Sequence, residues 1–199
     1  MNWSNQFVEL DKSTHDRDSF DCGETELNEF IQKFAAKHMH AGISRTMVLP
    51  ATTALPNNKN PICAFYTIAP SSIRRESLPE MLAKKLPRYP IPVFLLAQLA
   101  VHERYQGSGL GKIALIKALE YLWQVNGYLR AYAVVVDCLN EKAEQFYCKY
   151  GFELLCENNG RKRMYLSMKT IGQLFSSLQN FHVGDVDLNG TMCRRIKRS

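Results

Sequence analysis

The sequence predicts an α/β fold of the α+β kind, with a mixed central β-sheet of about six to seven strands flanked by helices. Two strand–helix units predict its parallel part: apolar stretches at 94–101 and 131–138 each run through a turn into a helical pattern. Antiparallel pairs are predicted near both ends of the chain, where strand patterns at 44–50 and 62–69, and at 152–156 and 164–168, are separated by turn residues.

Length and composition predict one domain over residues 1–175. The chain has 199 residues, of which 46% are apolar and 22% charged, as is usual for a single domain with a sizeable core. From about Ser176 the apolar periodicity is lost and the chain ends in a basic run. Residues 176–199 are therefore expected to be a tail that is flexible or not native to the domain.

The first half supplies a short strand, a helix and an antiparallel pair. Residues 7–10 have a strand pattern, and residues 25–40 predict an amphipathic helix that packs on the core. Glu26 and Glu29 lie near its start, where the helix dipole favours carboxylates. A loop rich in proline and asparagine then joins the strands at 44–50 and 62–69 in a hairpin-like connection.

Residues 71–88 combine helical spacing of apolar side chains with five basic ones. A solvated helix face explains the charges in the simplest way, and a surface that contacts a phosphate backbone is the more specific alternative. A turn bounded by prolines follows at 87–92. The basic side chains are Arg74, Arg75, Lys84, Lys85 and Arg88.

The glycine-rich turn at 106–111 lies between the apolar strand at 94–101 and a helix predicted at 112–125. Gly107, Gly109 and Gly111 alternate in this turn, and glycine lets backbone N–H groups approach a ligand closely at the positive end of a helix. The stretch at 94–111 therefore predicts an anion site that suits a pyrophosphate.

The second strand–helix unit begins at 131–138. Asn140 follows it as the first residue of a helix that contains Ala143, Phe146 and Tyr147. The last two strands are expected around a turn at 157–163, as a final hairpin.

Charge and cysteine content limit the location and the partners. A net charge of +6 and a pI near 9.0 are compatible with a polyanionic partner without requiring one. The six cysteines form no C-x-x-C pair and are interpreted as reduced thiols, and no metal-binding cluster is expected. No apolar run approaches the roughly 20 residues of a membrane span and no signal peptide is seen, so a cytoplasmic protein without membrane contact is expected.

Two other uses of a glycine turn fit poorly. A Walker A loop needs Ser or Thr after its Lys, but Ile113 follows Lys112. A dinucleotide-binding fold places the turn after its first strand and a carboxylate about 20 residues later, whereas this turn follows about the fourth strand and residues 126–131 contain no carboxylate.

Two motifs resemble those of the GNAT acetyltransferases. Residues 104–109, RYQGSG, match the signature R/Q-x-x-G-x-G/A, and residues 140–147 are similar to the segment N-x-x-A-x-x-x-Y. The order of elements over residues 7–168 also resembles that fold. The resemblance implies acetyl-CoA as acetyl donor, bound in a wedge where two central strands splay apart. The cofactor-binding residues it implies are Leu99, Ala100, Val101, Arg104, Gln106, Gly107, Ser108, Gly109, Leu110, Gly111 and Asn140, although Asn140 could equally cap its own helix.

Tyr147 is the candidate catalytic residue. Direct acetyl transfer needs a proton for the departing thiolate, whose parent thiol resembles cysteine with a pKa of about 8.5. A phenol with a pKa of about 10 stays protonated at neutral pH and can supply that proton as a general acid, while packing beside Phe146 is the alternative. His102 directly follows the strand and is interpreted as structural rather than as a base. The cysteines have no neighbouring histidine and are not candidate nucleophiles.

Nearly the whole chain before residue 176 resembles the GNAT toxins of bacterial type II toxin–antitoxin modules. The similar segments are FDCG (20–23), LNEF (27–30), YPIP (89–92), LAV (99–101), QGSGLG (106–111) and AVVVD (133–137). The resemblance implies acetylation of the α-amino group of aminoacyl-tRNA, inhibition of translation, a ribbon-helix-helix antitoxin and a homodimer.

A tRNA substrate would use the basic side chains as a binding surface. The candidates are Arg74, Arg75, Lys84, Lys85, Arg88, Arg161, Lys162 and Arg163. Two alternatives stay open: acetylation of protein amines or small-molecule amines on the same fold, and a catalytically inactive acyl-CoA-binding regulatory module, which retention of Tyr147 disfavours. Gln98 and His102 depart from the family pattern, so the acceptor amino acid is left open.

Overall fold

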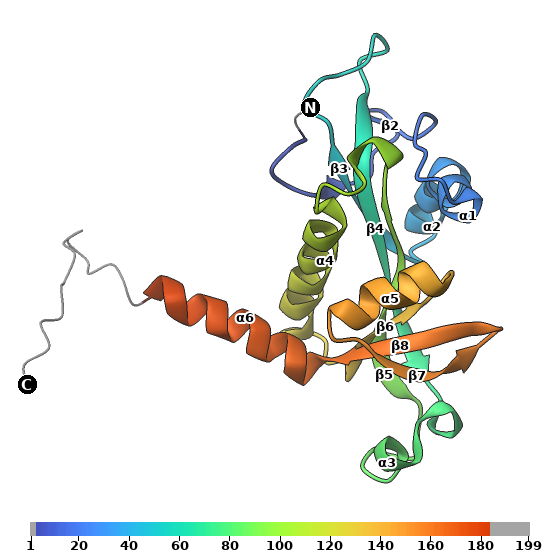
Figure 1. Ribbon diagram of the computed structural model, residues 1–199, viewed down its shortest axis with the longest axis vertical. Helices are drawn as coiled ribbons and strands as arrows, with labels where there is room; N and C mark the ends of the chain where they lie inside the picture. Colours follow the sequence, from blue (N-terminus) through green and yellow to red (C-terminus); the bar gives the residue numbers. More distant parts are fainter. Residues whose placement is uncertain (1–2, 184–199) are drawn as a thin grey trace, which may run out of the picture.

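A single mixed sheet of eight strands forms the centre of the molecule in the computed structural model, which describes residues 3–183 (Figure 1). The strand order is β1-β3-β4-β5-β6-β8-β7, with β2 paired to β4. The sequence predicts six to seven strands, and β2, which has two residues, is the strand it misses. The strands are β1 (Val8–Glu9), β2 (His15–Asp16), β3 (Arg45–Pro50), β4 (Asn60–Ile73), β5 (Ile91–Val101), β6 (Ala133–Asp137), β7 (Glu153–Asn158) and β8 (Arg161–Ser167).

Helices cover both faces of the sheet. The helical elements are α1 (Thr25–Glu29), the π-turn η1 (Phe30–Phe34), α2 (Ala35–His40), the 3-10 turns η2 (Arg75–Ser77) and η3 (Glu103–Tyr105), α3 (Glu80–Ala83), α4 (Leu110–Asn126), α5 (Glu141–Lys149) and α6 (Met168–Val183). Side chains alternate between the faces of a strand. Tyr66 of β4 accordingly packs with α4, α5 and α6, whereas its neighbour Phe65 packs with α1, η1 and α2 on the opposite face.

The two central strands β5 and β6 are parallel and separate soon after they meet. Only Phe94↔Val134 and Leu95↔Val135 are paired between them. A bulge in β5 follows at once, since Leu96 pairs with Ile68 and Gln98 with Thr67, so that Ala97 is the extra residue. A bulge bends its strand and increases the local twist, which carries β5 away from β6. The predicted splayed strand pair is thereby confirmed.

The segment at 71–88 differs from the single helical pattern expected. Strand β4 continues to Ile73 and pairs with Ile91 at the start of β5, so both strands are longer than the predicted 62–69 and 94–101. Helix α3 has only four residues, between Pro79 and the proline-bounded turn at 87–92. Proline disfavours helical geometry in the residue before it, which limits the helix at both ends.

The final hairpin has a tighter turn than the predicted 157–163. Asn159 and Gly160 have φ values of 50° and 74°, the left-handed pair that matches the twist of a two-residue hairpin turn. Arg161, Lys162 and Arg163 therefore belong to strand β8 rather than to the loop. Their side chains alternate between the two faces of the sheet.

Helix α6 continues past residue 175 to Val183, so the first part of the predicted tail is helical; residues 184–199 lie outside the described part of the chain. It packs against α4 at Gly172, where a Cβ atom would lie 2.5 Å from Cη2 of Trp123. Among residues 3–183, no helix is both long and apolar enough to cross a membrane.

Candidate functional site

A cleft of about 740 Å³ opens where β5 and β6 diverge. Its walls come from the second half of β5, the glycine turn, the end of β6, the first turns of α5, and the segment that leads into α1. The two motifs recognised in the sequence, at 104–109 and 140–147, thus meet at one site although α4 and β6 separate them in the chain.

The glycine turn has the geometry of an anion cradle. Gly107 and Gly109 have φ values of 77° and 84°, and the space beside each is open. A residue with a Cβ adopts this left-handed conformation at a cost, so the turn favours glycine. Gly109 is the N-cap of α4, whose first-turn N–H groups have no carbonyl one turn earlier and carry the positive end of the dipole. Lys112, in that first turn, also lines the cleft.

The edge of β5 that faces away from β4 offers backbone groups to the cleft. The His102 N–H donates to the Cys63 carbonyl of β4, and hydrogen-bonding direction alternates along an antiparallel pair. Ala100 therefore directs its backbone toward β4, while Leu99 and Val101 direct theirs toward the cleft. Leu99, Ala100 and Val101 all line the cleft. Of these three, Leu99 and Val101 have backbone groups directed so that they can hydrogen-bond an extended ligand.

Gln106 and Asn140 hold the walls of the cleft in position. The Gln106 side-chain amide donates to the carbonyls of Cys22 and Val101 at 2.8 and 3.0 Å. The Asn140 Oδ1 accepts from the Ala143 N–H at 3.0 Å and so caps α5, and its Nδ2 donates to Glu24 Oε1 at 3.0 Å. The capping role foreseen for Asn140 is confirmed.

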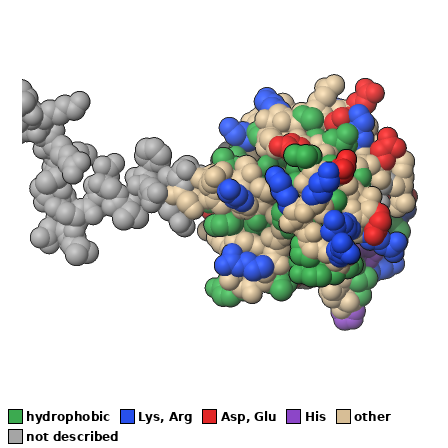
Figure 2. Space-filling view, turned by 90° about the horizontal axis from the view of Figure 1, so that it is seen from below, with side chains coloured by type: hydrophobic (Ala, Val, Ile, Leu, Met, Phe, Trp, Pro, Cys, Tyr) green, Lys and Arg blue, Asp and Glu red, His purple; other side chains and the backbone are tan. Residues whose placement is uncertain are grey.

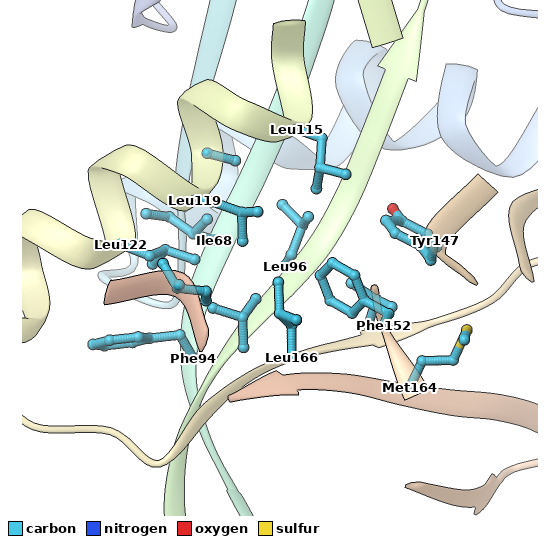
Figure 3. Packing of buried hydrophobic residues seen from close by; sticks show 14 of the residues in the cluster. Ile68, Phe94, Leu96, Leu115, Leu119, Leu122, Tyr147, Phe152, Met164 and Leu166 are labelled. Atoms are coloured by element: carbon cyan, nitrogen blue, oxygen red, sulfur yellow. The ribbon is translucent and has the colours of Figure 1, made fainter. Parts of the chain in front are cut away.

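Tyr147 lies at the boundary between the core and the cleft. Tyr147 is only 8% exposed, and its ring packs against Phe146 and against Phe152, beside which Figure 3 shows it. It nevertheless lines the cleft. Burial, with a smaller contribution from the nearby Cys138, raises the pKa of the Tyr147 phenol above its usual range. The phenol is therefore protonated at physiological pH and oriented by its neighbours.

The two cysteines closest to this chemistry are held as thiols. Cys22 lines the cleft, and burial raises its pKa while its Sγ donates to Asn28 Oδ1 at 3.2 Å. Burial also raises the pKa of Cys138 to about 11. A thiol with a raised pKa is a poor nucleophile at neutral pH, in agreement with direct transfer.

Three of the expected cofactor residues lie outside the cleft lining. The Leu110 side chain is fully buried in the core beneath the turn. Ser108 Oγ donates to the Tyr105 carbonyl, and the exposed Arg104 side chain also lies outside the lining. His102 is outside it as well: its ring contacts Phe20 and Tyr105, and its Nδ1 accepts from the Arg104 N–H. This placement fits the structural interpretation of His102.

The structure adds residues that the motifs did not identify. Lys112 directly follows the glycine turn, Lys142 comes two residues after Asn140, and the two place cations at the cleft. Because these lysines lie beside a predicted anion site in the sequence, their contribution of positive charge to that site could have been predicted. The carboxylates of Glu24, Glu26 and Asp137, which also line the cleft, come from distant segments and gave no such signal.

The eight predicted tRNA-binding residues fall into two groups that the structure does not bring together. Arg161, Lys162 and Arg163 each form an ion pair, with Glu26, Glu144 and Asp137 respectively, at distances of 2.6 to 2.8 Å. Arg74, Arg75, Lys84, Lys85 and Arg88 surround α3 at the opposite end of β5 from the glycine turn (Figure 1). Figure 2, a view from that end, shows Lys and Arg side chains interspersed with acidic and apolar ones.

Within that second group, two side chains are already engaged. Arg75 donates to the Leu86 carbonyl, and Lys84 pairs with Glu80 at 2.6 Å.

Among residues 3–183, no group of three or more His, Cys, Asp or Glu side chains is placed to hold a metal ion.

Comparison with known proteins relates the residues that form this cleft to a known family. Residues 83–152, which include both motifs, match the Acetyltransferase (GNAT) family. The chain is 31% identical over 137 residues to a tRNA-acetylating toxin of Mycobacterium tuberculosis (strain ATCC 25618 / H37Rv), which covers 68% of this chain and 77% of that protein.

Solved structures of AtaT have the same fold. The structure of AtaT complexed with acetyl-methionyl-tRNAfMet has a TM-score of 0.74 and 29% identity, covering 85% of this chain and 98% of that one. AtaTR bound with acetyl-CoA gives a TM-score of 0.73 and 30% identity, covering 85% and 97%. A mutant AtaT toxin bound to the C-terminus of the antitoxin AtaR has a TM-score of 0.72 and 25% sequence identity, and the match covers 86% of this chain and 98% of that one.

Proposed function

Because the chain belongs to the GNAT family of acetyltransferases, we propose that it is the toxin of a type II toxin–antitoxin module and acetylates aminoacyl-tRNA. The acetyl group passes from acetyl-CoA to the α-amino group of the amino acid carried by the tRNA. An acetylated α-amino group cannot enter a peptide bond as the nucleophile, so translation is inhibited.

The residues of the cleft fit acetyl-CoA as donor. The left-handed glycines and the N-terminus of α4 suit its pyrophosphate, and Lys112 and Lys142 add positive charge for its phosphates. The backbone groups of Leu99 and the N–H of Val101, whose carbonyl accepts from Gln106, suit the amides of its extended pantetheine arm, as an added strand would. When bound, acetyl-CoA supplies an activated acetyl thioester; the protein supplies orientation and a proton.

Tyr147 supplies the proton for the leaving sulfur. Attack by the amine forms the amide C–N bond, the C–S bond breaks, and the thiolate takes the phenolic proton. The proton released from the amine nitrogen then returns to the phenolate through water, so that charge and atoms balance. The acceptor amine is an aminoacyl ester amine, which is less basic than lysine, so a substantial fraction is neutral near pH 7 and a strong general base is less necessary.

The partners follow from the same proposal. Binding of an antitoxin is supported by the related AtaT toxin, which binds the antitoxin AtaR. The ribbon-helix-helix class of this antitoxin and a homodimeric toxin are further parts of the proposal. Its tRNA substrate reaches the cleft beside Arg161, rather than the surface around α3, because Arg161 is the one of the eight predicted tRNA-binding residues that lines the cleft.

The observation that carries the proposal is the convergence of the glycine cradle and the buried Tyr147 phenol on one cleft. The test uses labelled acetyl-CoA with charged tRNA, uncharged tRNA, protein and polyamine acceptors. We expect label in charged tRNA alone, and loss of about 10²- to 10⁴-fold in kcat for Tyr147→Phe with acetyl-CoA binding retained. Tyr128→Phe, which removes an exposed hydroxyl, is the control. Label only in protein or polyamine would contradict the tRNA assignment, and an active Tyr147→Phe would contradict the acid role.

A further inference from the structure

The segment that leads into α1, together with the first residues of that helix, lines the cleft and is hydrogen-bonded to both of its walls. We call residues 22–27 the strap. Its Cys22 carbonyl accepts from Gln106, the first residue of the glycine turn, and Glu24 accepts from Asn140 at the start of α5. Glu26 receives two hydrogen bonds from the Arg161 guanidinium, at 2.9 and 2.6 Å, at the start of β8. Residues separated in the chain by 116 and 135 positions are thereby joined across the wedge.

Helix α1, which contains the last residues of the strap, covers the face of the sheet opposite to the one on which α4 follows the glycine turn. In β8, Met164 and Leu166 pack with α4 and α5, and side chains alternate along a strand, so Arg161 belongs to the other face. Helix α1 covers that face, whereas the glycine turn leads into α4. With the donor's phosphates in the glycine turn, as proposed above, we expect the amine to approach from the side of α1 and Arg161.

The Glu26–Arg161 pair is suited to open. Its side chains are 49% and 39% exposed, and exposed ion pairs contribute little to stability because water and salt screen them. The Arg161 guanidinium bonds a carboxylate through two parallel N–H groups, and the same fork matches a phosphate. Glu26 therefore occupies, in the free protein, the position that a phosphate of an incoming nucleic acid would take.

From these contacts we infer that Arg161 exchanges Glu26 for a backbone phosphate of the acceptor strand, and that Glu26 acts as an internal competitor that restricts entry. This inference rests on the proposed tRNA substrate. It assigns Arg161 to binding of the acceptor and Glu26 to control of access, a role that no motif in the sequence indicates.

The two partners of the pair give opposite predictions. If the pair only stabilised the fold, Glu26→Gln and Arg161→Gln would have the same effect, because each breaks it. Partner exchange instead predicts that Glu26→Gln lowers the KM for aminoacyl-tRNA several-fold and Arg161→Gln raises it several-fold. Both should leave kcat and the KM for acetyl-CoA unchanged. Arg161→Lys keeps the positive charge but lacks the two parallel N–H donors. Its KM for aminoacyl-tRNA should therefore lie between those of the wild-type protein and Arg161→Gln.

A neighbouring ion pair supplies matched controls for the change in net charge. Lys33 and Glu29 form an exposed pair at 2.8 Å on the same helical segment, away from the cleft lining. Glu29→Gln and Lys33→Gln change the charge as the test variants do and should leave both KM values unchanged. Binding of uncharged tRNA gives a second readout, in which Arg161→Gln should reduce the slope of log affinity against log salt by about 0.7 to 0.9.

The experiment separates this inference from the proposed function. If the wild-type protein acetylates aminoacyl-tRNA but Glu26→Gln and Arg161→Gln shift its KM in the same direction, partner exchange is overturned. A changed KM for acetyl-CoA with an unchanged KM for tRNA would assign the phosphate to the donor and overturn it as well. Failure of the wild-type protein to acetylate aminoacyl-tRNA would contradict the proposed function itself, and the inference with it.

Discussion

Asn140 and Glu24, 116 positions apart in the chain, are joined across the cleft by a hydrogen bond of 3.0 Å from Nδ2 to Oε1. The same asparagine caps α5 through its Oδ1, and α5 carries Tyr147. One side chain thus positions both the strap and the helix that carries Tyr147, the proposed general acid. Its two functions are separable, because one uses the oxygen and the other the nitrogen of the amide.

Substitution of Asn140 should separate its capping of α5 from its hydrogen bond to Glu24. Asn140→Asp retains an oxygen that caps α5 but presents a carboxylate to Glu24, whereas Asn140→Ala removes both contacts. We expect Asn140→Ala to lower the free energy of unfolding by about 1 kcal/mol and to raise the KM for acetyl-CoA, and Asn140→Asp to do less of each. Urea unfolding and steady-state kinetics measure these quantities. An equal rise in KM for both variants would show that the cofactor uses the amide nitrogen directly.

The glycine cradle can be tested against a glycine of the same conformation elsewhere. Gly109 and Gly42 have φ values of 84° and 70°, and a Cβ at either would have nothing within 4 Å. Gly109→Ala and Gly42→Ala should each cost about 1 to 2 kcal/mol of stability, because both force an alanine into the left-handed region. Only Gly109→Ala should weaken acetyl-CoA binding, as measured by calorimetry. Equal weakening in both variants would assign the effect to general destabilisation.

His102 should affect stability and its pH dependence but not the chemical step. Burial, followed by the nearby Arg104, lowers the pKa of His102 below its ordinary value of 6.5, with smaller opposing effects from Glu103 and Asp21. A histidine that is kept neutral in the fold contributes stability that is complete above the unfolded-state pKa and is lost as the pH falls through the folded-state pKa.

For this reason, wild-type protein should lose more stability than His102→Asn between pH 7 and pH 5. Asparagine can still cap η3, and comparison of the two proteins cancels the contribution of His15, whose pKa burial also lowers. Urea unfolding across this range measures the difference, and parallel curves would refute it. A large loss of kcat in His102→Asn would instead identify this side chain as a base.

The docking of α6 on α4 depends on the absence of a side chain at Gly172. A Cβ there would lie 2.5 and 2.8 Å from Cη2 and Cζ3 of Trp123. Gly172→Ala should lower the free energy of unfolding by about 1 to 3 kcal/mol, despite the better helix propensity of alanine. The exposed Lys169→Ala is the control. In the Trp123→Leu background the cost of Gly172→Ala should largely disappear, and a cost that persists would exclude Trp123 as its cause.

The centre of the fold and the elements that form the cleft could be predicted from the sequence because their signals are local. The apolar strands at 94–101 and 131–138, the glycine turn and the Asn140 cap each act within a few residues. The segment at 71–88 was misread because Leu78, Met81, Leu82 and Leu86 have helical spacing. Its first residues instead extend β4, since Ile73 finds a partner in Ile91, 18 positions later in the chain.

The surroundings of Arg161 could not be predicted in this way, because the electrostatics there are set by long-range partners. The run of Arg161, Lys162 and Arg163 indicates a basic surface when read alone. In the fold, carboxylates from α1, α5 and β6 neutralise the three side chains one by one. No spacing rule links Glu26 to Arg161 across 135 positions.

The position of the transferred acetyl group tests the central claim most directly. Aminoacyl-tRNA is incubated with the protein and acetyl-CoA, the 3′-terminal aminoacyl-adenosine is released by ribonuclease, and its mass and fragmentation are measured. The account predicts an aminoacyl-adenosine that is heavier by one acetyl group on the α-nitrogen, and its loss with Tyr147→Phe. An unmodified aminoacyl end, or an acetyl group on the nucleotide, would contradict it.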